Sequence, residues 1–215
     1  MPFTHGQFLD LFGTYNSQLA PVVAGLWIVS LVAVARYFRG ELTRASAAGL
    51  LAAHWAWSGA VFHAAYFTRI NHAAWLFAAL FLAEAGAFLW LARRRDTAFV
   101  TPERDARTIF AAVFLIAALV YPALILMTGH AVPRAPLFAV PCPTTLLTAG
   151  LLLALGPLAP RWLFVIPVSW AAIGGFAALA LGVLPDYLLL AAGAVLVVFM
   201  LLPTLKRQVL AQAGR

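Results

Sequence analysis

Residues 108–128 of this chain read TIFAAVFLIAALVYPALILMT, an apolar run that contains no charged residue. A helix of that length rises about 30 Å, which matches the roughly 30 Å hydrocarbon core of a bilayer. The rest of the 215-residue chain has the same character, since 64% of its residues are hydrophobic and only 10% are charged. A soluble domain carries about 25% charged residues. The composition therefore predicts an integral membrane protein.

Apolar blocks of similar length recur along the whole sequence. They are continuously apolar and do not alternate apolar with polar residues, so they favour helices over the strands of a barrel. We expect an all-α fold, a polytopic membrane helix bundle with seven transmembrane helices, forming a single integral membrane domain over residues 1–215. The expected spans are 20–38, 46–67, 72–92, 108–128, 143–159, 161–183 and 185–205.

Residues 1–19 precede the first span and predict a short helix lying at the membrane interface. Thr4 and Gln7 have the spacing of a capping box, in which each residue hydrogen-bonds the backbone of the other. The segment has no basic n-region, so we do not expect a cleavable signal peptide. Its apolar residues recur on one helical face, as an interfacial helix requires: Phe8, Phe12, Tyr15 and Leu19.

The distribution of the basic residues predicts the orientation. Cytoplasmic loops carry an excess of Lys and Arg, and placing the N-terminus outside leaves only Arg69 and Arg134 on the outer side. The C-terminus is then cytoplasmic, and we expect the protein in a bacterial cytoplasmic membrane. The other twelve of the fourteen cations fall on the inner side: Arg36, Arg39, Arg44, Arg93, Arg94, Arg95, Arg104, Arg107, Arg161, Lys206, Arg207 and Arg215.

Several classes of function are excluded by what the sequence lacks. The net charge of +7 sits in short inter-span segments without interleaved aromatic residues, so no nucleic-acid partner is expected; the bilayer itself is the expected partner. No phosphate-binding glycine loop, nucleophile elbow or zinc-protease signature is present. The only lysine, Lys206, lies at the end of the last span, which excludes a retinal Schiff base in mid-helix.

Small residues recur at four-residue spacing in three of the expected spans, a pattern typical of close helix packing. The three stripes are Ala52, Ala56, Ala60 and Ala64, then Ala79, Ala83 and Ala87, and finally Gly174, Ala178 and Gly182.

Two ionisable residues fall near mid-membrane, where such groups are costly. His54 in the second span and Glu84 in the third lie at nearly equal depth on consecutive helices, so a contact between them is geometrically possible. One interpretation is a coupling pair that relays protons or coordinates a cation. The other is a neutral pair that only holds two helices together, and we favour this second interpretation.

A second polar set gathers toward the outer side. His63, Asn71, His130 and Cys142 are the candidate ligand-binding residues, because all four fall at or near the outer ends of their spans. Imidazole and thiolate ligands suit Zn(II) or Cu(I), so His130 and Cys142 are also candidate metal ligands. Their spacing matches no recognised metal motif, and interfacial histidines without a ligand are common.

Cys142 lies in the loop between the fourth and fifth expected spans, which contains Pro133, Pro136, Pro141 and Pro143. Prolines fix the backbone, so this loop should be stiff. At a helix start the cysteine could act as a reactive or metal-binding thiol, or the loop could act as a gate. It could equally be a small apolar filler in a rigid helix start.

A set of short motifs is spread along the chain: Met1-Pro2-Phe3-Thr4, Trp55-Ala56-Trp57-Ser58-Gly59, His63, Phe67, Ile70-Asn71, Gly129-His130, Pro133, Pro136 and Val140-Pro141-Cys142-Pro143-Thr144-Thr145. In these motifs the chain resembles a bacterial family of multipass membrane proteins, the domain of unknown function 6064. The resemblance implies no activity, cofactor or partner.

Three functions are consistent with these observations. We expect a permease that binds a small solute or a metal ion through an outward-facing His/Asn/Cys site. The alternative is a non-catalytic accessory subunit of a larger membrane complex, because the loops are short and no soluble domain is evident. An intramembrane enzyme using Cys142 is the third, but no catalytic residue is assigned and no cofactor is indicated.

Overall fold

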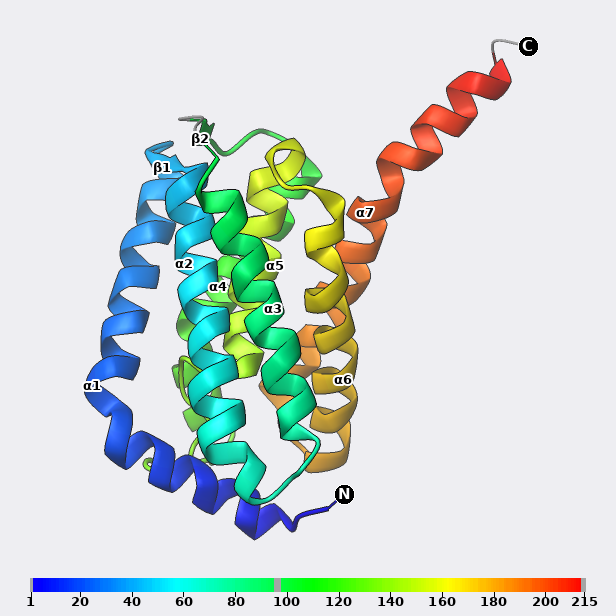
Figure 1. Ribbon diagram of the computed structural model, residues 1–215. Helices are drawn as coiled ribbons and strands as arrows, with labels where there is room; N and C mark the ends of the chain where they lie inside the picture. The colour runs from blue at the N-terminus through cyan, green and yellow to red at the C-terminus, as the bar shows by residue number, and fades with distance from the viewer. Residues whose placement is uncertain (1, 95–97, 214–215) are drawn as a thin grey trace.

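Long apolar runs become helices because a helix satisfies its own backbone hydrogen bonds without water. The computed structural model describes residues 2–94 and 98–213, with side chains described as far as residue 201, and in this part the chain forms a helix bundle (Figure 1). The α-helices are α1 (His5–Phe38), α2 (Arg44–Trp57), α3 (Ala74–Ala92), α4 (Ala106–Met127), α5 (Pro141–Leu155), α6 (Val165–Leu181) and α7 (Leu188–Ala213). The shorter elements are the strands β1 (Leu42–Thr43) and β2 (Phe99–Val100), the π-helix η1 (Ser58–Tyr66), and the 3-10 helices η2 (Phe67–Arg69), η3 (Gly156–Leu158), η4 (Arg161–Phe164) and η5 (Leu184–Tyr187).

The interfacial segment and the first expected span are joined in α1. The predicted capping box is confirmed, since the Gln7 backbone N–H donates to Thr4 Oγ1 at 3.2 Å and the Thr4 N–H to Gln7 Oε1 at 2.8 Å. Pro21 lies inside the helix, where a missing N–H and the pyrrolidine ring cause a kink. Figure 1 shows the result: the first half of α1 lies across one end of the bundle, and the second half runs alongside α2.

Six helical segments in the described chain are long and apolar enough to cross a membrane. They correspond to all of the expected spans except 46–67. That expected span falls on α2, η1 and η2, which follow one another from residue 44 to residue 69 while the helix type changes at Ser58. The all-α membrane architecture is therefore confirmed, and the seventh crossing stays a prediction.

The fifth expected span becomes the central helix of the bundle. Most of α5 is buried, and α5 packs against α2, α4, α6 and α7. Its close approach to α4 depends on Gly150, because a Cβ there would lie 2.6 Å from Leu115 Cγ and 3.0 Å from the Ala111 carbonyl oxygen. On α2, the indole N–H of buried Trp55 donates to Thr148 Oγ1 of α5 at 2.8 Å.

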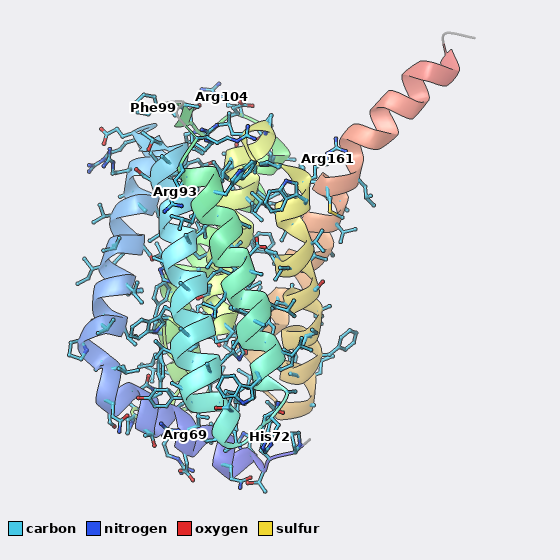
Figure 2. The ribbon with its side chains drawn as sticks, viewed as in Figure 1. Arg69, His72, Arg93, Phe99, Arg104 and Arg161 are labelled. Carbon is cyan, nitrogen blue, oxygen red and sulfur yellow. The ribbon has the colours of Figure 1, made fainter. Side chains whose placement is uncertain are left out.

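The two ends of the bundle differ in charge. Figure 2 labels Arg93, Arg104 and Arg161 at one end and Arg69 with His72 at the other. At the arginine-rich end, β1 and β2 pair antiparallel, with Leu42 opposite Val100 and Thr43 opposite Phe99. Arg95 and Arg215, which were expected at this end, lie outside the described residues, and the side chains of Lys206 and Arg207 do so as well.

One of the three small-residue stripes does not pack as predicted, because Ala79 and Ala83 are exposed on α3. The other two stripes are mixed, since Ala60 and Gly182 are exposed while Ala52, Gly174 and Ala178 are buried. The buried face of α3 is instead formed by Ala74, Ala78, Phe81, Glu84, Ala85, Phe88 and Leu91. A lipid-facing helix surface also tolerates alanine, so spacing alone does not say which face meets a neighbour.

Candidate functional site

A cavity of about 230 Å³ lies at the end of the bundle near Arg69 and His72. Three of the four candidate ligand-binding residues line it: His63, Asn71 and Cys142. The three residues therefore line one cavity, and their role in binding stays a prediction. The remaining walls are mostly apolar and aromatic: Pro2, Phe3, Phe8, Phe12, Phe62, Phe67, Phe77, Tyr121, Pro136, Val140, Pro141, Trp170, Ile173, Gly174, Ala177, Ala178, Leu181, Val183 and Asp186.

His63 projects from the π-helix η1 and is completely buried. Neither of its ring nitrogens has a hydrogen-bond partner among the described residues. Its neighbours are aromatic, with ring centroids of Phe81 at 4.7 Å, Trp170 at 5.1 Å and Phe77 at 5.6 Å. π-Helical segments are rare and are frequently found at functional sites. His63 is therefore the strongest candidate for a functional residue in this cavity.

Trp170 on α6 is a second cavity residue with an unpaired polar atom. Its indole Nε1 is buried and has no hydrogen-bond partner within the described part of the chain. The same nitrogen lies 3.4 Å from the point where a Cβ on Gly174, another cavity residue, would sit. Sequence reasoning missed Trp170, because an isolated tryptophan in an apolar span gives no signal that its N–H lacks a partner.

Asn71 has a structural role in addition to lining the cavity. Its side-chain Oδ1 accepts the Ala73 backbone N–H at 3.0 Å, and so organises the turn that leads into α3. The side chain is half-buried. Asn71 therefore presents its amide NH₂ as the donor that remains for other contacts.

Cys142, Asp186 and Tyr121 form a polar cluster in the cavity wall, in which Tyr121 and Asp186 are buried and Cys142 is half-buried. The Tyr121 hydroxyl donates to Asp186 Oδ1 at 2.6 Å, and the Cys142 thiol also hydrogen-bonds the Asp186 carboxylate. Asp186 belongs to η5, whereas Tyr121 and Cys142 come from α4 and α5. A thiol that serves as a donor must carry its proton, so this arrangement supports an anchoring role for Cys142 more than a reactive one.

His130 does not join the other candidate residues. It is placed beside a different cavity of about 350 Å³, together with His5 and Arg134, and its Nδ1 lies 3.1 Å from Thr128 Oγ1. Among the described residues, no group of three or more His, Cys, Asp or Glu side chains could hold a metal ion. His130 and Cys142 therefore line different cavities, and a metal site formed by the two stays a prediction.

The expected His54–Glu84 contact is also not formed: the described residues contain no hydrogen bond or ion pair between them. His54 Nε2 instead lies 2.9 Å from Ser30 Oγ on α1, and its ring packs against Phe138 at 5.5 Å. Glu84 is buried with its Oε1 unpaired within the described chain. Equal depth was inferred from residue counts, but depth does not fix rotation about the helix axis. The side of α2 that faces α3 is occupied by the neighbouring Trp55, whose ring centroid lies 4.3 Å from that of Phe81 on α3.

The N-terminal half of α1 covers the cavity and is held in place by polar contacts. Tyr15 donates to the Ala139 carbonyl oxygen at 2.8 Å, and Asn16 Nδ2 donates to those of Pro133 and Ala135 at 2.6 and 2.7 Å. All three acceptors belong to the proline-rich loop. Because Phe3, Phe8 and Phe12 of this segment line the cavity, the expected interfacial helix is also part of the candidate site.

The fold and the cavity together define a polytopic helix-bundle membrane protein with a mostly apolar cavity at one end of the bundle. Residues 5–211 match the model of a family of unknown function, DUF6064, and the chain belongs to that family. The resemblance found in its sequence motifs is thereby confirmed at the level of the family. Searches of curated proteins and of solved structures found no significant match.

Proposed function

We propose that this protein binds a small, largely apolar solute in the cavity lined by His63, within a bacterial cytoplasmic membrane. The observation that carries the proposal is the completely buried imidazole whose two ring nitrogens are unpaired in the described structure. A buried polar group without a partner costs about 1–3 kcal/mol, so native proteins rarely keep one without a use. A bound solute would provide the missing hydrogen bond.

The size and the chemistry of the cavity support a small ligand. An engineered apolar cavity of about 150 Å³ in another protein binds benzene, so the present 230 Å³ has room for a somewhat larger molecule. Binding sites for small molecules are typically apolar with a few polar groups that fix orientation. His63, Asn71 and Trp170 are such groups here.

The proposal includes a topology, because the cavity must open to a defined side. Seven crossings with the N-terminus outside would place the cavity, together with Arg69, at the outer face. The arginine-rich end in Figure 2 would then face the cytoplasm. Solute recognition at the outer face would suit a permease, and the transport step itself stays a prediction.

Native mass spectrometry of the purified protein tests the proposal. Ala177→Phe should fill the cavity, because Ala177 lines it, whereas Ala79→Phe changes an exposed position on α3 and serves as the matched control. The wild type and the control are expected to carry a co-purified small molecule, and Ala177→Phe is expected to lack it. Equal ligand occupancy in all three, or no bound molecule in the wild type after extraction in mild detergent, would contradict solute binding in this cavity.

A second candidate function, an accessory subunit of a larger complex, is favoured by a different surface. A groove of about 570 Å³ runs between α1 and α2, and nothing lies within 4 Å of a Cβ placed at Gly25 or Gly49 in it. Small residues of this kind let a transmembrane helix of a partner protein approach closely. Purification from the native membrane distinguishes the two, since a stoichiometric partner that is lost in Gly25→Leu would favour the subunit.

A further inference from the structure

Two residues that line the cavity, Trp170 and His63, each have a buried N–H without a partner in the described part of the chain, and their rings are in contact. An indole nitrogen can only donate, and a neutral imidazole has one N–H and one bare nitrogen. The two ring centroids are 5.1 Å apart and the rings are nearly perpendicular, at 76°. A carbonyl oxygen has two lone pairs, so a single carbonyl group can accept from two donors. The unpaired groups therefore call for a ligand that carries an acceptor oxygen.

The other polar groups of the cavity do not call for a charged ligand. Asp186 already accepts hydrogen bonds from Tyr121 and Cys142, and Asn71 Oδ1 already accepts one from Ala73. An ammonium ligand could donate only to the bare nitrogen of His63, and the unpaired Trp170 N–H would remain unsatisfied beside it. A neutral carbonyl compound satisfies both donors without displacing any existing bond.

The walls of the cavity determine the shape of the ligand. Phe62, Phe67, Phe77 and Trp170 surround His63 with ring-to-ring distances between 5.1 and 5.9 Å. Aromatic rings favour flat partners that stack or meet edge to face. A volume of about 230 Å³ is roughly one and a half times that of the benzene-binding cavity cited above, which is room for two fused rings.

We infer that the cavity binds a planar, two-ring carbonyl compound of the naphthoquinone class, with one carbonyl oxygen between Trp170 Nε1 and the His63 imidazole. This inference rests on the proposed function and specifies its ligand.

A matched pair of probes tests the inference on the purified full-length protein. The probes are 2,3-dimethyl-1,4-naphthoquinone and 2,3-dimethylnaphthalene, which share a carbon skeleton and differ in the two carbonyl groups. Methyl groups at both ring positions block addition of the Cys142 thiol. Two hydrogen bonds should make the quinone bind the wild type at least about tenfold more tightly than the hydrocarbon, measured as dissociation constants by equilibrium dialysis in detergent.

Variants then show which residues produce the preference. His63→Phe and Trp170→Phe each keep an aromatic ring and remove one donor, so the ratio of quinone to hydrocarbon affinity should fall to roughly threefold or less. Trp75→Phe, at a tryptophan that is 60% exposed, should change neither value. Unfolding temperatures of all variants check that they fold, and the wild-type ratio tests the inference even if one variant does not.

Three outcomes would overturn the inference. Equal affinities for the two probes in the wild type would remove the role of the carbonyl group, yet solute binding would survive. A preference unchanged in both His63→Phe and Trp170→Phe would place the carbonyl elsewhere. If neither probe bound, the ligand class would be wrong, and the co-purified molecule measured in the Ala177→Phe comparison would show separately whether solute binding also fails.

Discussion

Two buried polar side chains in the same cavity wall have opposite surroundings. Asp186 accepts hydrogen bonds from Tyr121 and Cys142, whereas His63 has no partner for either ring nitrogen in the described chain. The satisfied group explains how η5, α4 and α5 are held together. A ligand would supply the missing hydrogen bond of the unsatisfied group. The free-energy cost of a buried donor without a partner is larger than the net stabilisation from a typical hydrogen bond.

Asp186→Ala should destabilise the protein by about 1–3 kcal/mol, because the buried Tyr121 hydroxyl would lose its acceptor. Chemical unfolding in detergent micelles measures the change. Asp10→Ala is the control, since it removes a carboxylate whose ion pair with Arg134 is solvent-exposed and contributes little. Similar losses in the two variants would show that the Tyr121–Asp186 bond is not a significant contributor.

Asp105 gives a prediction about pH. It caps α4, and the hydrogen bond from the Thr108 backbone N–H lowers the pKa of its carboxyl below the ordinary value of 3.8. A carboxyl whose pKa is lower in the folded protein than in the unfolded chain stabilises the fold at any pH above its pKa in the unfolded chain. This stabilisation is lost as the pH falls through the pKa of the folded protein. Asp105→Asn keeps a capping side chain that does not titrate. The wild type should be the more stable at about pH 6, and the difference should shrink by about pH 3 in unfolding midpoints. A constant difference would contradict the role of the charge.

At the scale of single residues, the sequence predicted which residues line the cavity better than it predicted their contacts. His63, Asn71 and Cys142 were grouped from their positions near the outer span ends, and all three line one cavity. His130 was grouped by the same criterion, but the loop that follows it turns back into the bundle, as the buried Phe138 shows. Trp170 and its unpaired N–H could not be foreseen, because satisfaction of a donor depends on tertiary contacts.

At the scale of elements, the π-helix η1 is the feature that places His63. It packs against α3 at Gly59, where a Cβ would lie 3.0 Å from Phe81 Cβ and 3.2 Å from the Ala78 carbonyl oxygen. No sequence pattern announces a π-helix, and residues 46–67 were predicted as one regular helix. The glycine is part of the tryptophan-rich motif that supports the family resemblance, which gives that motif a packing explanation.

Gly59→Ala should therefore destabilise the protein by about 1–3 kcal/mol, because neither the Ala78 backbone nor the start of the Phe81 side chain can easily move away. Gly86→Ala on α3 is the matched control. Nothing lies within 4 Å of its Cβ position, so alanine should stabilise the helix by up to about 1 kcal/mol. Unfolding midpoints of the two variants should move in opposite directions. A shift of the same sign would mean that the close approach of η1 to α3 is not maintained in the protein.

The small-residue stripes show where prediction of helix packing fails. Gly174 and Ala178 on α6 are buried as expected, with the Cβ position of Gly174 only 3.1 Å from Leu189 of α7. Ala79 and Ala83 have the same spacing and are exposed. In a soluble helix the apolar face identifies the core, but a membrane helix is apolar on every side, so this signal is absent.

At the scale of the whole molecule, the two termini lie at opposite ends of the bundle, and the labelled arginines divide unequally between these ends (Figures 1 and 2). Charge sorting and helix lengths were both readable from the sequence, because the bilayer imposes them one segment at a time. The cavity was not readable, since it depends on how α1 bends over the bundle and which side chains then meet.

Labelling of introduced cysteines tests this arrangement. In a Cys142→Ser background, Arg69→Cys and Arg104→Cys place single thiols on either side of α3, at the positions labelled at opposite ends in Figure 2. With the proposed orientation, a membrane-impermeant maleimide should label position 69 in intact spheroplasts and position 104 only after lysis, because the charged reagent cannot cross hydrocarbon. The reverse pattern would invert the protein and place the His63 cavity at the cytoplasmic face. Labelling of both positions before lysis would mean that α3 does not cross the membrane, and the bundle could then not be a seven-span structure.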